Sequence, residues 1–149
     1  MNPLDVLIPG LSPELGVECY ISNFVPIRHM LAAAALLWPE FRVIENIVIL
    51  DSSLNSYPNW KDKIQTNPAS VESILNHRHL MDIFEIPAHT HPTPTHAQIL
   101  ALGRLLKETW IAKLNRDFPT RTFTVDFPET FNLETDNPSI TFWQTPKEM

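Results

Sequence analysis

The spacing of apolar residues predicts two helices in the first forty positions. Ser12 and Pro13 form a favourable helix start, because serine caps free amides and proline fits the first turn. We expect a short helix over residues 12–20 and a second over residues 26–38, where apolar side chains recur at helical spacing. The proline-interrupted segment before them predicts a short strand at Val6–Ile8.

Residues 43–50 form the clearest predicted strand. Most are β-branched, and residues 47–50 are apolar without alternation. A strand of this kind is usually buried on both faces, so we expect it near the centre of a sheet. The polar, turn-rich residues 52–67 that follow predict a loop.

Two longer helices are predicted over residues 68–84 and 96–117. An asparagine followed by proline at 67–68 starts the first of them. Thr95 and Gln98 match the capping box, in which each side chain bonds the backbone amide of the other residue. The second helix carries one apolar stripe, so we expect it to lie across a sheet.

Two strands at the C-terminal end alternate apolar and polar residues, over 122–127 and 140–143. We expect them to pair antiparallel across the loop 128–138, with an edge strand at 131–135 as an alternative. The order of elements indicates the α+β class, with a small antiparallel or mixed sheet of three to four strands packed against three to four helices. We expect one globular domain spanning residues 1–149.

Charge and hydropathy narrow the class of partner. Seventeen acidic and eleven basic residues give a formal charge of −6 at pH 7, which argues against nucleic acid as the partner and favours a basic protein.

The longest apolar run, 30–38, falls short of the ~20 residues that a membrane span needs, and no basic leader precedes it. We therefore expect a soluble, cytoplasmic protein without a membrane segment. The lone Cys19 fits a reducing compartment.

Five of the six histidines fall between residues 77 and 96, which suggests a metal site as an alternative. His89 and His91 point to the same side of an extended segment, and His96 at the next helix start is a third candidate ligand. Three histidines with an open position are typical of catalytic zinc. The alternative function is therefore a zinc-dependent hydrolase, with Glu85 in the site and Glu85 or Asp82 as the base.

Two observations favour a structural role for the histidines. His77 and His79 fall in a predicted helix, where positions two apart point about 200 degrees away from each other. The His-x-His of 89–91 resembles the motif of metallo-β-lactamases, but Thr93 and Pro94 stand where that motif has aspartate and histidine. We therefore expect these imidazoles to serve folding and solvation, without a bound cofactor.

The sequence lacks the glycine-rich loops that bind phosphates or dinucleotides, and it contains only three glycines. It favours a non-enzymatic protein-interaction module, such as an acidic inhibitor, an immunity-type protein or an adaptor that binds a basic partner. The candidate partner-binding surface consists of four acidic residues and one tryptophan near the C-terminus: Asp126, Glu129, Glu134, Asp136 and Trp143. A homodimer through the face of Ala32–Ala35 or through a sheet edge is an alternative.

Overall fold

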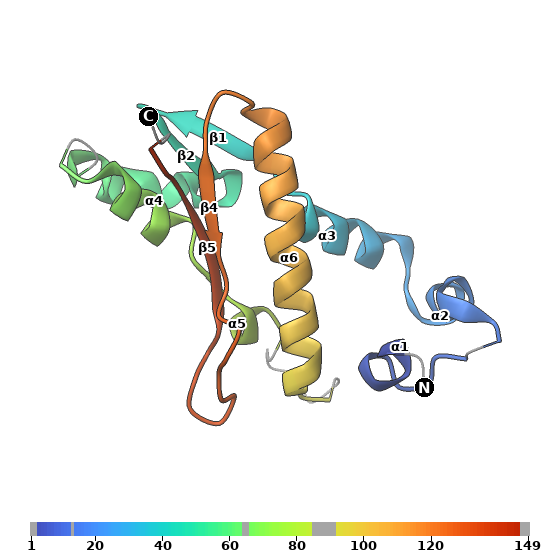
Figure 1. Cartoon of the computed structure of the whole chain (residues 1–149). Coiled ribbons are helices and arrows are strands. Elements are labelled where there is room, and N and C mark those ends of the chain that lie inside the picture. Colours follow the sequence, from blue (N-terminus) through green and yellow to red (C-terminus); the bar gives the residue numbers. More distant parts are fainter. Residues whose placement is uncertain (1–2, 13, 64–65, 85–91, 147–149) are drawn as a thin grey trace. The chain divides into compact units, whose positions relative to one another are not determined.

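The computed structural model describes residues 3–12, 14–63, 66–84 and 92–146 (Figure 1). The chain divides into two compact units, an N-terminal unit of residues 1–36 and a C-terminal unit of residues 37–149. The described part of the N-terminal unit is helical, and every described strand lies in the C-terminal unit. The single domain expected from the sequence therefore stays a prediction.

The N-terminal unit is built from short helices. They are α1 (Pro3–Leu7), α2 (Gly16–Phe24) and α3 (Ile27–Leu37), the last residue of which belongs to the C-terminal unit. The predicted strand at residues 6–8 is wrong, because this segment continues α1 and the Ile8 amide donates to the Leu4 carbonyl at 2.8 Å. A helical turn satisfies these backbone groups locally, without needing a partner strand.

A capped turn precedes α2, which therefore begins later than predicted. The Ser12 hydroxyl accepts from the Leu15 amide at 3.3 Å, and the Ser12 carbonyl accepts from the Gly16 amide at 2.9 Å. Gly10 and Gly16 adopt positive φ angles of 90° and 73°, which side chains disfavour. The serine thus caps this turn, and α2 starts at the second glycine.

A β-hairpin opens the C-terminal unit. It consists of β1 (Phe41–Ile44) and β2 (Ile47–Leu50), which pair antiparallel. The single strand predicted over 43–50 is wrong, because Glu45 and Asn46 turn the chain with φ angles of 49° and 72°. Two consecutive residues with positive φ are characteristic of the tight turns that match the twist of a hairpin. Every residue of β2 is buried, as its unbroken apolar run predicted.

Short elements replace the predicted loop and helix that follow. They are the 3₁₀ helices η1 (Asp51–Asn59) and η2 (Lys61–Lys63), then α4 (Pro68–Leu75), β3 (Arg78–His79) and α5 (Leu80–Phe84). The helix predicted over 68–84 is therefore interrupted. It ends at Asn76, whose buried side chain bonds to neighbouring strands.

The long helix and the C-terminal strands follow the sequence prediction. They are α6 (His96–Asp117), β4 (Phe123–Asp126) and β5 (Ser139–Gln144). The capping box is present, with the Gln98 amide donating to the Thr95 hydroxyl at 3.2 Å. β4 and β5 pair antiparallel as expected, and β3 joins the other edge of β5, so the strand order is β3-β5-β4. Residues 133–135 form a turn in which the Thr135 amide donates to the Asn132 carbonyl at 3.1 Å, so the alternative edge strand at 131–135 is wrong.

Helix α6 lies across one face of the β4–β5 pair, as predicted (Figure 1). Trp110 of α6 meets Phe142 of β5 edge to face, with ring centroids 5.9 Å apart, and both side chains are fully buried. Phe123 and Val125 of β4 are buried on the same face. A second apolar cluster joins the hairpin to α4, and it contains Ile47, Ile49, Val71 and Leu75.

Two buried side chains of α4, Glu72 and Asn76, connect β2 to β5. Glu72 accepts from the amide of Val48 at 2.8 Å and from the amide of Gln144 at 3.0 Å. Asn76 accepts from the amide of Leu50 at 2.9 Å and donates to a carbonyl of β5 at 3.3 Å. These side chains fill the hydrogen-bonding positions that a further strand would occupy between β2 and β5. We call this contact the α4 seam.

The fold is therefore of the α+β class. The strands within the described ranges form two antiparallel sheets, of two and three strands, rather than one sheet. The reason is the α4 seam, which places helix side chains between β2 and β5 where direct strand pairing would have joined the two sheets.

Candidate functional site

The predicted acidic surface is divided between the two faces of the three-stranded sheet. Asp126 lies opposite Thr141 and Trp143 lies opposite Thr124, so Asp126 and Trp143 share the face that points away from α6. Glu129 instead pairs with Arg104 of α6, at 2.6 Å. The hydrogen bond from Arg104 lowers the pKa of Glu129 below its ordinary value.

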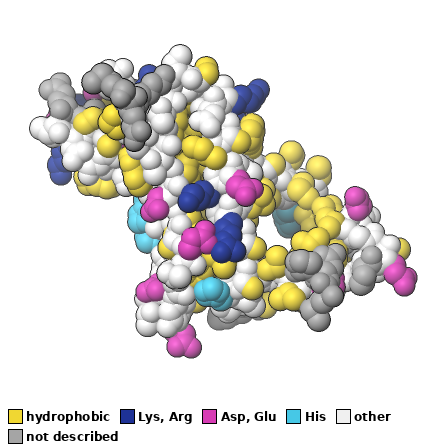
Figure 2. All heavy atoms as spheres, viewed as in Figure 1, with side chains coloured by type: hydrophobic (Ala, Val, Ile, Leu, Met, Phe, Trp, Pro, Cys, Tyr) yellow, Lys and Arg dark blue, Asp and Glu magenta, His cyan; other side chains and the backbone are white. Residues whose placement is uncertain are grey.

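Glu134 and Asp136 lie in an exposed turn that Asn132 organises. The Asn132 amide donates to Asp136 at 2.8 Å, and the Asn132 side chain accepts from the Glu134 amide at 3.0 Å. Figure 2 shows acidic and basic side chains intermixed on the face that carries α6, without a continuous acidic area. Of the five predicted partner-binding residues, the structure thus brings Asp126 and Trp143 to one face and leaves Glu129, Glu134 and Asp136 in the loop between β4 and β5.

Trp143 lines a shallow groove of about 240 Å³ between β5 and α4. The opposite wall consists of small side chains, those of Ala69, Ser70 and Ser73. Trp143 is half-buried, so the indole covers the α4–β5 contact as well as facing the groove. The groove is open and offers few polar groups to fix a ligand.

Most of the predicted zinc site falls outside the described residues, because His89, His91 and Glu85 are not among them. His96 is described, and its ring stacks on Phe131 with centroids 4.4 Å apart. The His96 Nε2 atom lies 3.2 Å from the Phe131 carbonyl oxygen. Within the ranges that the structure describes, no three His, Cys, Asp or Glu side chains are grouped so as to hold a metal ion. The zinc site therefore stays a prediction.

His77 and His79 contact each other, contrary to the prediction from a helical segment. Their ring centroids lie 4.3 Å apart, because the chain is extended at β3 and residues two apart then point to the same side. His79 Nδ1 lies 3.0 Å from the carbonyl oxygen of Asn137. Burial, followed by the adjoining His79 and Arg78, lowers the pKa of His77 below its ordinary value of 6.5.

Because the pKa of His77 is lowered, we expect the folded state to lose stability in mild acid. Because the folded state depresses the pKa of His77, the unfolded chain binds that proton more readily, and stability falls as the pH drops through about 6.5 and below. Urea unfolding at about pH 7.5 and about pH 5.5 measures the loss. His77→Gln is expected to reduce it, whereas His29→Gln on exposed α3 is not. If the free energy of unfolding falls equally in wild type and in His77→Gln between these two pH values, the prediction is wrong.

The N-terminal unit exposes an unusual amount of apolar surface. Helices α2 and α3 contain no buried side chain, and Leu11 is the one buried residue described in this unit. Among the described residues, half of the fourteen exposed large apolar side chains lie here: Leu4, Val6, Leu15, Val17, Phe24, Ile27 and Leu31. Figure 2 shows hydrophobic side chains gathered over these helices. This surface could not be predicted from the sequence, because apolar residues at helical spacing are typical of a core face and of a docking face alike.

None of the described helices is long and apolar enough to cross a bilayer by itself. Helices α2 and α3 reach the required length and hydropathy only when taken together, and they are bent by 118°.

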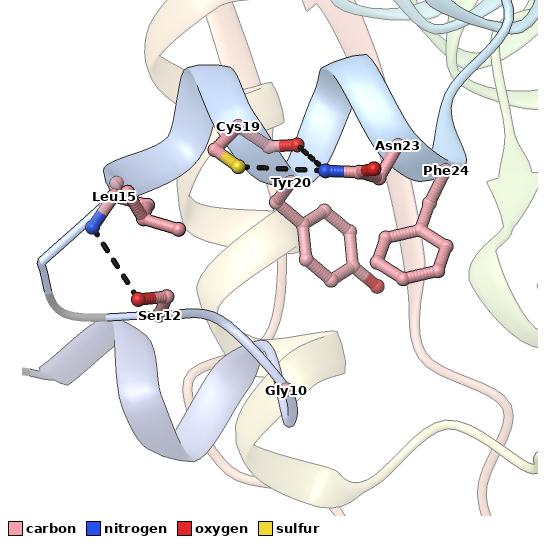
Figure 3. A pocket seen from close by; sticks show the side chains of 8 residues that line it. Gly10, Ser12, Leu15, Cys19, Tyr20, Asn23 and Phe24 are labelled. Carbon is pink, nitrogen blue, oxygen red and sulfur yellow. Dashed lines mark hydrogen bonds between the residues drawn. The ribbon is translucent and has the colours of Figure 1, made fainter.

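A pocket of about 170 Å³ lies within the N-terminal unit, between α2 and the turn before it (Figure 3). It is lined by Gly10, Ser12, Leu15, Gly16, Cys19, Tyr20, Asn23 and Phe24. The rings of Tyr20 and Phe24 contact each other, with centroids 5.0 Å apart. The Asn23 amide donates to the Cys19 carbonyl at 2.8 Å and to the Cys19 sulfur at 3.4 Å, so this polar group is bonded within α2.

No family model, curated protein or solved structure matches the chain. Its function is therefore inferred from the chemistry of its own surfaces.

Proposed function

We propose that the chain is a non-enzymatic interaction module that binds a basic partner protein through its N-terminal unit. The observation that carries the proposal is that α2 and α3 are rich in apolar residues and yet bury none of them. The side chains of Phe24, Ile27 and Leu31 are 67%, 74% and 63% exposed. Covering a large apolar side chain contributes about 1.5–3 kcal/mol, so a partner that docks here gains substantial free energy.

The exposed apolar side chains are enough to form a substantial part of an interface. A standard interface buries ~800 Å² per partner, and the seven large apolar side chains here are 37% to 74% exposed. Helix α3 has eleven residues, fewer than the ~12–15 that an isolated helix needs in water. Contact with a partner would therefore stabilise the helix as well as cover it.

Charge favours a basic partner. The N-terminal unit carries Asp5, Glu14 and Glu18 against a single basic residue, Arg28. The whole chain is acidic, with a formal charge of −6. Such a surface attracts basic proteins over long range and repels acidic ones. The zinc-dependent hydrolase remains the alternative function.

Replacing two apolar residues of α3 by serine tests the proposal. The Ile27→Ser/Leu31→Ser variant is expected to weaken the complex about 100-fold or more, because it removes two large exposed apolar groups from the docking face. The partner is first captured from cells with the wild-type chain and identified by mass spectrometry. Its affinity for each variant is then measured by calorimetry with purified proteins.

A matched variant in the C-terminal unit provides the control. Val43 and Leu105 are apolar and 46% and 44% exposed, and Val43→Ser/Leu105→Ser should leave the affinity unchanged. Amide exchange supplies a second measurement, because α2 and α3 should exchange rapidly alone and slowly in the complex. Equal affinity of both variants for the purified partner, or no added protection of α2 and α3, would refute the proposed docking face.

A further inference from the structure

We propose that the pocket beside α2 receives one apolar side chain of the partner, and that Glu18, whose carboxylate lies near Gly16 of the pocket, pairs with a lysine or arginine next to that side chain. This inference rests on the proposed function and specifies what the partner must present. The ligand class is therefore a peptide segment in which a large apolar residue adjoins a basic one.

The pocket has the size and lining of a receptor for one side chain. Its volume of about 170 Å³ is slightly larger than the ~150 Å³ of an engineered apolar cavity that binds benzene. The rings of Tyr20 and Phe24 project side by side from α2 and form one wall of the pocket (Figure 3). In protein complexes, side chains that fill such pockets supply a large share of the binding free energy.

The carboxylate of Glu18 lies close to Gly16, one of the residues that line this pocket. A Cβ atom placed on Gly16, which lines the pocket, would lie 3.2 Å from Glu18 Oε2. Glu18 is exposed, and none of the ion pairs among the described residues involves Glu14, Glu18 or Arg28. An anchor that enters the pocket would therefore bring its neighbouring residue close to a carboxylate that has no cationic partner in the described part of the chain.

The same charges argue against other occupants of this surface. Helices that lie on anionic membranes carry lysine and arginine on their polar face, whereas α2 carries Glu18 and no basic residue. A second copy of this chain would bring its own Asp5, Glu14 and Glu18 toward the same acidic groups. A basic protein segment satisfies both the apolar pocket and the carboxylate.

Capped dipeptides test the inference on the full chain. The probes are N-acetyl-leucyl-arginine amide, N-acetyl-leucyl-glutamate amide and N-acetyl-glycyl-arginine amide. Binding is followed by the NMR shifts of α2 amides and by the rate of alkylation of Cys19, the one cysteine of the chain and part of the pocket lining. We expect leucyl-arginine to bind about twofold to fivefold more tightly than leucyl-glutamate, as an exposed ion pair allows. Glycyl-arginine should leave both signals unchanged.

Two variants separate the pocket from the carboxylate. Cys19→Phe fills the pocket without changing the charge, and it should abolish the NMR shifts caused by both leucyl probes. Glu18→Lys leaves the pocket open and should reverse the preference between them. Glu40→Lys changes another exposed glutamate, in the C-terminal unit, and should leave the preference as in wild type.

Several outcomes would overturn the inference: equal binding of the two leucyl probes, or shifts that survive Cys19→Phe in a folded variant. If the chain binds phosphatidylserine vesicles and Glu18→Lys strengthens that binding, the surface binds lipid. If the chain dimerises through α2, the surface binds a second copy. Either result also overturns the inference. If the probes fail while Ile27→Ser/Leu31→Ser still abolishes partner binding, the pocket assignment is wrong and the proposed function stands.

Discussion

Replacing Glu72 by glutamine is expected to lower the free energy of unfolding by about 2–4 kcal/mol, because the α4 seam uses both carboxylate oxygens as acceptors. Oε2 accepts from the Val48 amide at 2.8 Å and from the Gln144 side-chain amide at 2.7 Å, while Oε1 accepts from the Gln144 backbone amide at 3.0 Å. Glutamine has one acceptor oxygen, so its NH₂ group would face an N–H donor. Glu72 is 1% exposed, so water cannot replace the lost bond. Urea unfolding measures the change.

The control is a second glutamate on a helix. Glu108 of α6 is exposed, so Glu108→Gln should change stability by less than about 0.5 kcal/mol. Asn76→Asp is a further variant of the seam, because it removes the amide that donates to carbonyls of β2 and β5 at 3.0 and 3.3 Å. If Glu72→Gln is no more destabilising than Glu108→Gln, the seam does not hold the two sheets together.

The elements that could be predicted from the sequence depend on local signals. Helix α6 begins at its capping box because Thr95 and Gln98 exchange their bonds within one turn. Strands β4 and β5 alternate apolar and polar residues, so their period shows which face is buried. These features need no knowledge of distant parts of the chain.

The α4 seam could not be predicted because its partners are far apart in sequence. Glu72 and Asn76 are polar residues on a short helix, and such residues are usually exposed. Only the folded chain brings them against Val48 and Gln144, which are 24 and 72 positions from Glu72. For the same reason the apolar run of β2 indicated burial correctly but could not show that helix side chains occupy its outer edge.

The candidate site was still harder to predict. Apolar residues at helical spacing in α2 and α3 match the pattern of core helices, and only the three-dimensional packing shows that they stay exposed. The pocket depends on the turn at Gly10 and Gly16, which folds back against α2. The acidic cluster was visible in the sequence, but the pairing of Glu129 with Arg104 could not be inferred, because these residues are 25 positions apart.

Substituting alanine for Gly103 is expected to destabilise the fold by about 1–2 kcal/mol, although the same change usually stabilises a helix by about 0.5–1 kcal/mol. Gly103 is buried on α6, and a Cβ atom at this position would overlap the ring of Phe127. Phe127 is 3% exposed and its ring packs against Phe131, so it has little room to move away. Overpacking of a core typically costs about 1–3 kcal/mol, which exceeds the gain in helix propensity.

A double-mutant cycle identifies the cause of this loss. Leucine at position 127 is smaller than phenylalanine and makes room for the new methyl group. Gly103→Ala/Phe127→Leu should therefore be less destabilising than the sum of the two separate changes. Asn115→Ala, on the exposed side of α6, measures the gain from alanine where nothing packs against it. Thermal and urea unfolding of the four proteins of the cycle supply the values. If Gly103→Ala raises the free energy of unfolding as much as Asn115→Ala does, then α6 and Phe127 are not in close contact.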